Sequence, residues 1–173
     1  MLSFEKLEFY NPSKGIIKFG SLAEEVFSYM KQEPESFYEI VAGCDSSSDM
    51  YPVFPVAIVV LRKGFGGRFF LTKIKYQRME KKKFFTFQQR ILEEVYLSCE
   101  VALRFREALK ERISRCSKVS LRYRFEYIHA DVGKNGPTKD MIKEVAGLIR
   151  SNGFTPKIKP QSFAASIVAD RFS

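Results

Sequence analysis

The longest uninterrupted apolar run in the chain, Pro55–Leu61, is only as long as one β-strand. A short continuous apolar run indicates a strand that is buried on both faces, as in a sheet flanked by helices. The same run is far shorter than the roughly 20 apolar residues that a membrane-spanning helix needs. We therefore expect a globular α/β protein without a membrane partner.

The sequence as a whole predicts one α/β domain over residues 1–173, because the chain shows no linker or repeat. Residues 1–36 are interpreted as an N-terminal extension with a short helix that Ser21 caps. Three antiparallel strands are then expected, followed by a long helix with an apolar stripe and alternating strands and helices. The predicted ranges are strands 37–44, 55–62 and 68–75, helix 87–115, strand 121–132, a helix that Thr138 caps, strand 156–159, and a last helix from Ser162 to about Asp170.

Positive charge is concentrated in one segment. The net charge is +9, and residues 62–90 contain 10 basic side chains but one acidic side chain. Aromatic residues alternate with these cations, which suits a polyanion that also offers flat bases. The segment favours nucleic acid as partner, although a solubilising hairpin with its aromatics in the core gives the same pattern. The candidate nucleic-acid-binding residues are Arg62, Lys63, Arg68, Lys73, Lys75, Arg78, Lys81, Lys82 and Lys83.

Two predicted strands run into a carboxylate, at Asp45 and at Asp131. If these strands are neighbours, both side chains emerge at the strand ends, where open α/β sheets bind ligands. Either aspartate alone is equally explained by a turn whose amides it satisfies. At 100° per residue Glu94 flanks the apolar stripe of the long helix, whereas Glu93 points to solvent. Asp170 lies on the apolar side of the last helix.

Carboxylates that converge repel one another, and hard divalent cations relieve that repulsion. Oxygen ligands select Mg²⁺ or Mn²⁺, and two such ions about 4 Å apart promote phosphodiester cleavage. We therefore predict two ions per site, with Asp45, Glu94, Asp131 and Asp170 as metal ligands and catalytic residues. His129 shares strand parity with Asp131 and is a candidate proton shuttle, although a buried core histidine explains its position equally well.

Short motifs along nearly the whole chain carry a family resemblance. They are Phe9-Tyr10-Asn11-Pro12-Ser13, Gly43-Cys44-Asp45-Ser46, Glu94 with Ser98, His129-Ala130-Asp131-Val132-Gly133, Asn135-Gly136 with Thr138-Lys139, Ile158-Lys159-Pro160, Ser162-Phe163-Ala164-Ala165-Ser166 and Val168-Ala169-Asp170. With these motifs the chain resembles the YkuK-type family of ribonuclease H-like proteins, a group of largely uncharacterised bacterial proteins. The resemblance implies a mixed five-stranded sheet flanked by helices, with the first and fourth strands adjacent. It also implies an acidic site made of Asp45, Glu94, Asp131 and Asp170.

Taken together, these patterns predict a Mg²⁺- or Mn²⁺-dependent nuclease that cleaves RNA or hybrid or structured nucleic acid. A nucleic-acid-binding module without turnover and a protein-interaction scaffold remain alternatives, because the same fold serves all three. The N-terminus lacks a signal-peptide pattern, and the three cysteines form no CxxC pair. Both features favour a reduced cytoplasmic protein. Cys44 departs from the small hydroxyl residue expected in relatives, and its thiol could sensitise the site to oxidation.

Overall fold

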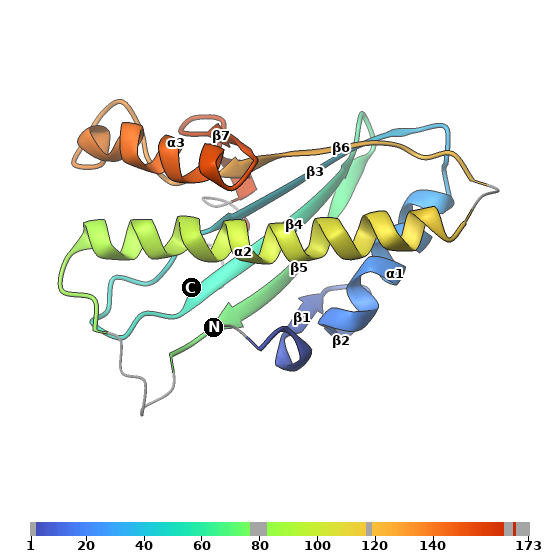
Figure 1. Ribbon diagram of the computed structural model, residues 1–173, viewed down its shortest axis with the longest axis horizontal. Helices are drawn as coiled ribbons and strands as arrows, with labels where there is room; N and C mark the ends of the chain where they lie inside the picture. The colour runs from blue at the N-terminus through green and yellow to red at the C-terminus, as the bar shows by residue number, and fades with distance from the viewer. Residues whose placement is uncertain (1–2, 77–82, 117–118, 165–167, 169–173) are drawn as a thin grey trace.

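The computed structural model describes residues 3–76, 83–116, 119–164 and 168. Within these residues, seven strands form one mixed sheet in the order β2-β1-β5-β4-β3-β6-β7 (Figure 1). In chain order the elements are η1 (Phe4–Lys6), β1 (Glu8–Asn11), β2 (Gly15–Lys18), α1 (Phe19–Lys31), β3 (Phe37–Cys44), β4 (Phe54–Arg62), β5 (Gly66–Ile74), α2 (Phe87–Ser114), β6 (Arg122–His129), η3 (Lys139–Met141), α3 (Ile142–Ser151) and β7 (Thr155–Lys157).

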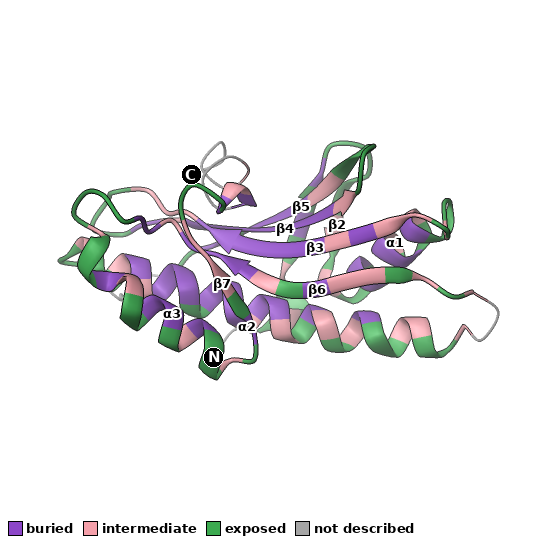
Figure 2. Ribbon diagram, turned by 90° about the horizontal axis from the view of Figure 1, so that it is seen from above, coloured by how far each residue is buried: buried purple, intermediate pink, exposed green. Residues whose placement is uncertain are grey.

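Both faces of the sheet are covered. The helices pack on one face, where Ile40 and Ala42 of β3 join the main apolar core (Figure 2). On the other face, Val41 and Ala57 pack in a smaller cluster with Ala164 of the C-terminal segment. The first seven residues of β4 are buried, which confirms the interpretation of the apolar run. None of the described helices is both long and apolar enough to cross a lipid bilayer.

The five predicted strands are present as β3, β4, β5, β6 and β7. β3 pairs antiparallel with β4 and parallel with β6, so the expected adjacency of the first and fourth predicted strands is confirmed. β7 extends the sheet in parallel beyond β6. These five strands therefore have the mixed arrangement that the family resemblance implies.

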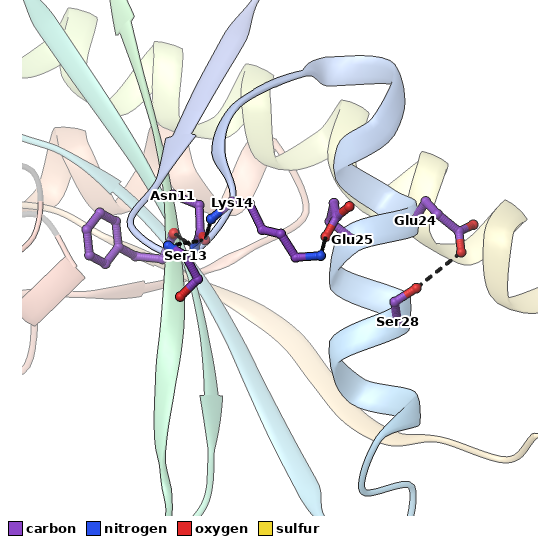
Figure 3. A network of polar contacts seen from close by, with 7 residues as sticks. Asn11, Ser13, Lys14, Glu24, Glu25 and Ser28 are labelled. Atoms are coloured by element: carbon purple, nitrogen blue, oxygen red, sulfur yellow. Dashed lines mark hydrogen bonds and ion pairs between the residues drawn. The ribbon is translucent and has the colours of Figure 1, made fainter.

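The predicted count of five strands is wrong, because residues 8–18 form a hairpin that joins the same sheet. β1 pairs with β2, and Tyr10 of β1 pairs with Leu71 of β5. Asn11 holds the turn: its Oδ1 accepts from the backbone N–H groups of Ser13 and Lys14, at 3.0 Å each (Figure 3). Strands of four residues are too short to show a clear alternation, so the sequence indicated only the turn.

Two predicted helix starts are also corrected. α1 begins at Phe19 rather than after Ser21, and Lys18 occupies its N-cap position. Thr138 occupies the N-cap position of the short 3-10 helix η3 and not of α3, which begins only at Ile142, and its side chain makes no capping bond, because its Oγ1 accepts a 3.1 Å hydrogen bond from the N–H of Gly133. α2 ends at Ser114 and is capped at Thr86. Most of the predicted last helix lies outside the described residues.

Candidate functional site

Asp45 and Asp131 follow two strands that end side by side. Gly43 of β3 is in register with His129 of β6, and each aspartate comes two residues later. Because the two strands are parallel, both chains leave the sheet at the same edge (Figure 1). Both aspartates are half-buried. The structure thus brings together the two carboxylates that the sequence placed at strand ends.

Glu94 reaches the same edge from α2. Its carboxylate is buried, and its Oε1 accepts hydrogen bonds from the backbone N–H of Ser46 at 3.0 Å and from the Ser46 hydroxyl at 2.6 Å. Burial raises the pKa of Glu94 to about 7, and the negative charges of Asp45 and Asp131 contribute to the rise, whereas the Ser46 bonds oppose it. Asp45 and Asp131 are therefore close enough to affect the protonation of Glu94.

Asp131 is bound on one side by a lysine. Lys159 places its Nζ 2.9 Å from Oδ2 of Asp131. The second oxygen, Oδ1, is buried and accepts no hydrogen bond from the described residues. A buried carboxylate oxygen without a donor is costly, so this atom is suited to a cation or a water molecule.

These carboxylates fit a hard divalent cation in their chemistry, because they offer oxygen ligands and excess negative charge at one edge. Within the described part of the chain, however, no three acidic, histidine or cysteine side chains are grouped closely enough to hold an ion. Asp170, the fourth predicted ligand, lies outside that part. Metal binding at Asp45, Glu94, Asp131 and Asp170 therefore stays a prediction.

His129 lies on the face of the sheet that the C-terminal segment covers. Its Nδ1 accepts a 3.1 Å hydrogen bond from the N–H of Ala164, and its ring meets the edge of Phe163 at 4.6 Å between centroids. Burial and then the cation of Lys157 lower the pKa of His129 to about 4. A neutral imidazole at this position joins the C-terminal segment to β6. Its role as a proton shuttle stays a prediction.

Glu93 contradicts the expectation that it points to solvent. It is buried, and the Tyr76 hydroxyl donates a hydrogen bond to its Oε1. The segment after β5 causes this burial, because Tyr76 and Phe84 pack around Phe54 beside the start of α2. Helical periodicity could not show that a second segment covers this side of the helix.

Cys44 is buried directly before Asp45. Burial raises the pKa of its thiol well above the ordinary value, and the negative charges of Glu94, Asp45 and Glu93 add to the effect. A buried, protonated thiol is a poor nucleophile. This environment argues against the expected sensitivity to oxidation.

The hairpin of β4 and β5 divides the basic segment between two ends of the sheet. We call the end of the sheet at Asp45, Glu94 and Asp131 the acidic edge, and the turn between β4 and β5 the tip of the hairpin. Lys73 pairs with Pro55 near the acidic edge, whereas Arg68 pairs with Val60 near the tip. β4 is nine residues long, so its ends are separated by roughly 25 Å. Arg62 and Lys63 also lie at the tip, whereas Lys75 and Lys83 are near the acidic edge and, like Lys73, are exposed. Arg78, Lys81 and Lys82 lie outside the described residues.

The cations at the tip contact the protein itself. Arg62 lies 3.9 Å from a carboxylate oxygen of Glu33 and stacks over Phe65, and Arg68 stacks over Tyr29. The structure therefore separates Arg62, Lys63 and Arg68 from the acids and leaves Lys73, Lys75 and Lys83 as the described members of the segment beside them.

A family model of ribonuclease H-like proteins matches residues 21–173. The chain therefore belongs to the ribonuclease H-like family, in agreement with its strand order. It is similar to "Uncharacterized protein YkuK" of Bacillus subtilis (strain 168), with 29% identity over 170 residues, which cover 95% of this chain and 96% of that protein. The resemblance drawn from the motifs is confirmed. No solved structure matches the chain significantly.

Proposed function

We propose that this protein is a divalent-cation-dependent nuclease acting at an acidic edge formed by Asp45, Glu94 and Asp131. The main support is that Asp45 and Asp131 follow the neighbouring ends of β3 and β6, and that Ser46, directly after Asp45, holds Glu94 of α2 at the same edge. Membership of the ribonuclease H-like family supports a role connected with nucleic acid. Asp170 is proposed as the fourth carboxylate, and RNA or hybrid or structured nucleic acid as the substrate.

The charge at this edge supports cation binding. Burial raises the pKa of Glu94 and the charges of Asp45 and Asp131 add to the rise, and Oδ1 of Asp131 has no hydrogen-bond partner among the described residues. A pair of Mg²⁺ or Mn²⁺ ions, when bound, supplies water activation and stabilises charge on the leaving oxygen. Ser46 positions the Glu94 carboxylate for this role, and Lys159 balances the charge of Asp131 when no cation is bound.

Exposed lysines beside the acidic edge are proposed to bind the sugar-phosphate backbone of the nucleic acid. Lys73 lies at the end of β5, next to the start of β4, and Lys75 follows it. Lys83 adjoins Phe84, whose ring packs against Phe54. These positions allow the lysines to contact phosphates close to the carboxylates. Such contacts matter because lysines and arginines that neutralise phosphates supply much of the binding energy between a protein and a nucleic acid.

Cleavage of labelled RNA and RNA–DNA hybrid in Mg²⁺ or Mn²⁺ tests the proposal. We expect EDTA to abolish cleavage, and Asp45→Asn and Asp131→Asn to reduce it at least about 100-fold, since each removes a charged ligand. Glu107→Gln is the matched control, because Glu107 is exposed on α2 and pairs only loosely, at 3.9 Å, with Arg104. Circular dichroism checks that each variant folds. Cleavage that persists in EDTA or in Asp131→Asn contradicts the proposal.

A nucleic-acid-binding module without turnover is the second candidate. Two observations favour it. Lys159 contacts Asp131, and no three potential ligands among the described residues are close enough together to hold a metal ion. This alternative predicts salt-sensitive binding that is unchanged by EDTA and by Asp131→Asn.

The N-terminal residues and the cysteines support two further proposals. β1 and β2 extend the common sheet and α1 contributes to the main core, which supports a single domain over residues 1–173. Cys44, Cys99 and Cys116 are free thiols. Free thiols are typical of a reducing compartment, so we propose a cytoplasmic location.

A further inference from the structure

A pocket of about 600 Å³ lies directly beyond Asp131. Its walls come from two loops, one after β6 and one after β7, and we call it the β6–β7 pocket. It is lined by Gly133, Lys134, Asn135, Ile158, Lys159, Pro160 and Gln161. Of its lining residues, only Lys159 has a role above, as the ion-pair partner of Asp131.

Backbone hydrogen bonds fix the two loops against each other. The N–H of Lys159 donates to the carbonyl of Val132 at 2.9 Å, and the N–H of Ala130 donates to the carbonyl of Lys157 at 2.9 Å; within the second loop, the N–H of Gln161 donates to the carbonyl of Ile158 at 2.8 Å. Gly133 allows the close approach, because a Cβ there would lie 3.3 Å from Cβ of Lys159. The pocket is thus held by the main chain, and Lys134, Asn135 and Gln161 remain exposed.

The polar lining is suited to an anion. It offers two ammonium groups, from Lys134 and Lys159, and two amide side chains, from Asn135 and Gln161, and none of the described residues that line it carries a carboxylate. Lys159 is half-exposed and already contacts the neighbouring Asp131. Ammonium and amide N–H groups are the donors that bind phosphate oxygens.

We propose that the β6–β7 pocket binds one phosphate group of the nucleic-acid strand, next to the phosphodiester held at the acidic edge. This inference rests on the proposed function for its choice of ligand. The sheet order supports it, since Lys73 and Lys75 lie on the β5 side of the acids and the pocket lies on the β7 side. From β5 to β6 there are three strand spacings, or about 15 Å, so one strand of nucleic acid can cross the acids and contact both groups of lysines.

Binding of a fluorescent single-stranded RNA, followed by anisotropy in EDTA over a series of salt concentrations, tests the pocket. We expect Lys134→Ala to weaken binding about 3- to 10-fold and to lower the slope of log affinity against log salt by about 0.7, as expected for one lost phosphate contact. Gln161→Ala should weaken binding without changing the slope. Lys110→Ala, which removes an exposed lysine near the end of α2, should change neither.

Competition with inorganic phosphate distinguishes a pocket that binds a phosphate of the RNA from one that binds only a free phosphate ion. We expect millimolar phosphate to compete with the RNA in the native protein and to compete less well in Lys134→Ala. If Lys134→Ala weakens only the binding of inorganic phosphate and leaves RNA affinity unchanged, the proposal is overturned.

Cleavage assays keep this inference separate from the proposed function. If Lys134→Ala weakens RNA binding while the native protein cleaves nothing, the pocket is supported and the nuclease proposal fails. If cleavage requires Asp131 but Lys134→Ala and Gln161→Ala bind RNA like the native protein at every salt concentration, the pocket fails and the nuclease proposal stands.

Discussion

Ser46 donates two hydrogen bonds to one carboxylate oxygen of Glu94, from its backbone N–H at 3.0 Å and from its hydroxyl at 2.6 Å. Ser46 directly follows Asp45 after β3, whereas Glu94 lies on α2. The two bonds therefore join the helix to the strand end at the acidic edge. They also favour the charged carboxylate, which opposes the effect of burial on the pKa of Glu94.

Removing the Ser46 hydroxyl should weaken this connection. Ser46→Ala keeps the backbone bond but loses the shorter one, so we expect the free energy of unfolding to fall by about 1.5 kcal/mol. Mn²⁺ affinity should fall too, because the pKa of Glu94 rises further. Urea unfolding and calorimetric Mn²⁺ titration measure the two effects.

Ser28→Ala is the matched control for that change. Ser28 donates to Glu24 at 3.2 Å, and this serine–glutamate bond lies on the exposed side of α1 (Figure 3). We expect a change within about 0.5 kcal/mol. Equal losses in Ser28→Ala and Ser46→Ala would contradict a special role for the buried bond.

Glu94 and His129 should give opposite pH dependences of stability. The pKa of Glu94 is raised from 4.5 to about 7, so its contribution to stability is lost as pH rises towards 7. The pKa of His129 is lowered from 6.5 to about 4, so its contribution is lost as pH falls from 6.5 towards 4. Between about pH 4.5 and 6.5 the two effects oppose each other and largely cancel.

Single variants separate the two titrations. In Glu94→Gln, stability should fall with decreasing pH by up to about 1.4 kcal/mol per pH unit, and in His129→Asn it should fall with increasing pH. Urea unfolding at pH 4.5 to 6.5 measures the slopes, and the double variant gives the contribution of all other groups. If neither single variant differs in slope from the double variant, the assigned pKa shifts are wrong.

Lys159 should compete with a cation at Asp131. Its ammonium lies 2.9 Å from Oδ2, so Lys159→Gln removes the positive charge and should strengthen Mn²⁺ binding about 3- to 10-fold. Calorimetry measures the affinity. Lys14→Gln, which breaks a comparable 3.1 Å ion pair with Glu25 far from the site (Figure 3), should leave it unchanged. Weaker Mn²⁺ binding in Lys159→Gln would instead mean that the lysine supports the site.

Asn11 should be important for stability rather than chemistry. It is buried, its Nδ2 donates to the carbonyl of Phe69 at 2.8 Å, and its Oδ1 accepts two backbone N–H groups in the hairpin turn. Asn11→Ala removes these three side-chain hydrogen bonds, whereas the N–H of Lys14 keeps its 3.2 Å bond to the carbonyl of residue 11, so we expect a loss of about 3 kcal/mol in the free energy of unfolding. Asn152→Ala, which removes one bond at the end of α3, should cost about 1 kcal/mol. Similar losses in both variants would contradict this role.

Local pattern was sufficient to predict the central sheet. The apolar run that became β4 needs cover on both faces wherever it folds, and the strands that became β3 and β6 carry their carboxylates at their ends. The motifs indicated the family, which then implied that these two strands are neighbours. Short strands were missed, because the four-residue strands of residues 8–18 show no clear alternation and join the sheet through β5, which is distant in the chain.

The sequence by itself determined the class of fold and the family, because strand hydrophobicity and short motifs are local properties of the chain, and the family resemblance implied that the strands before Asp45 and Asp131 are neighbours. Only the tertiary structure decided which side chains share an environment. Glu93 is buried and accepts a hydrogen bond from Tyr76. Arg62 and Arg68 lie at the far end of the β4–β5 hairpin, and Lys159 contacts Asp131. Such contacts depend on segments that are distant in the chain, and no periodicity within one segment can encode them.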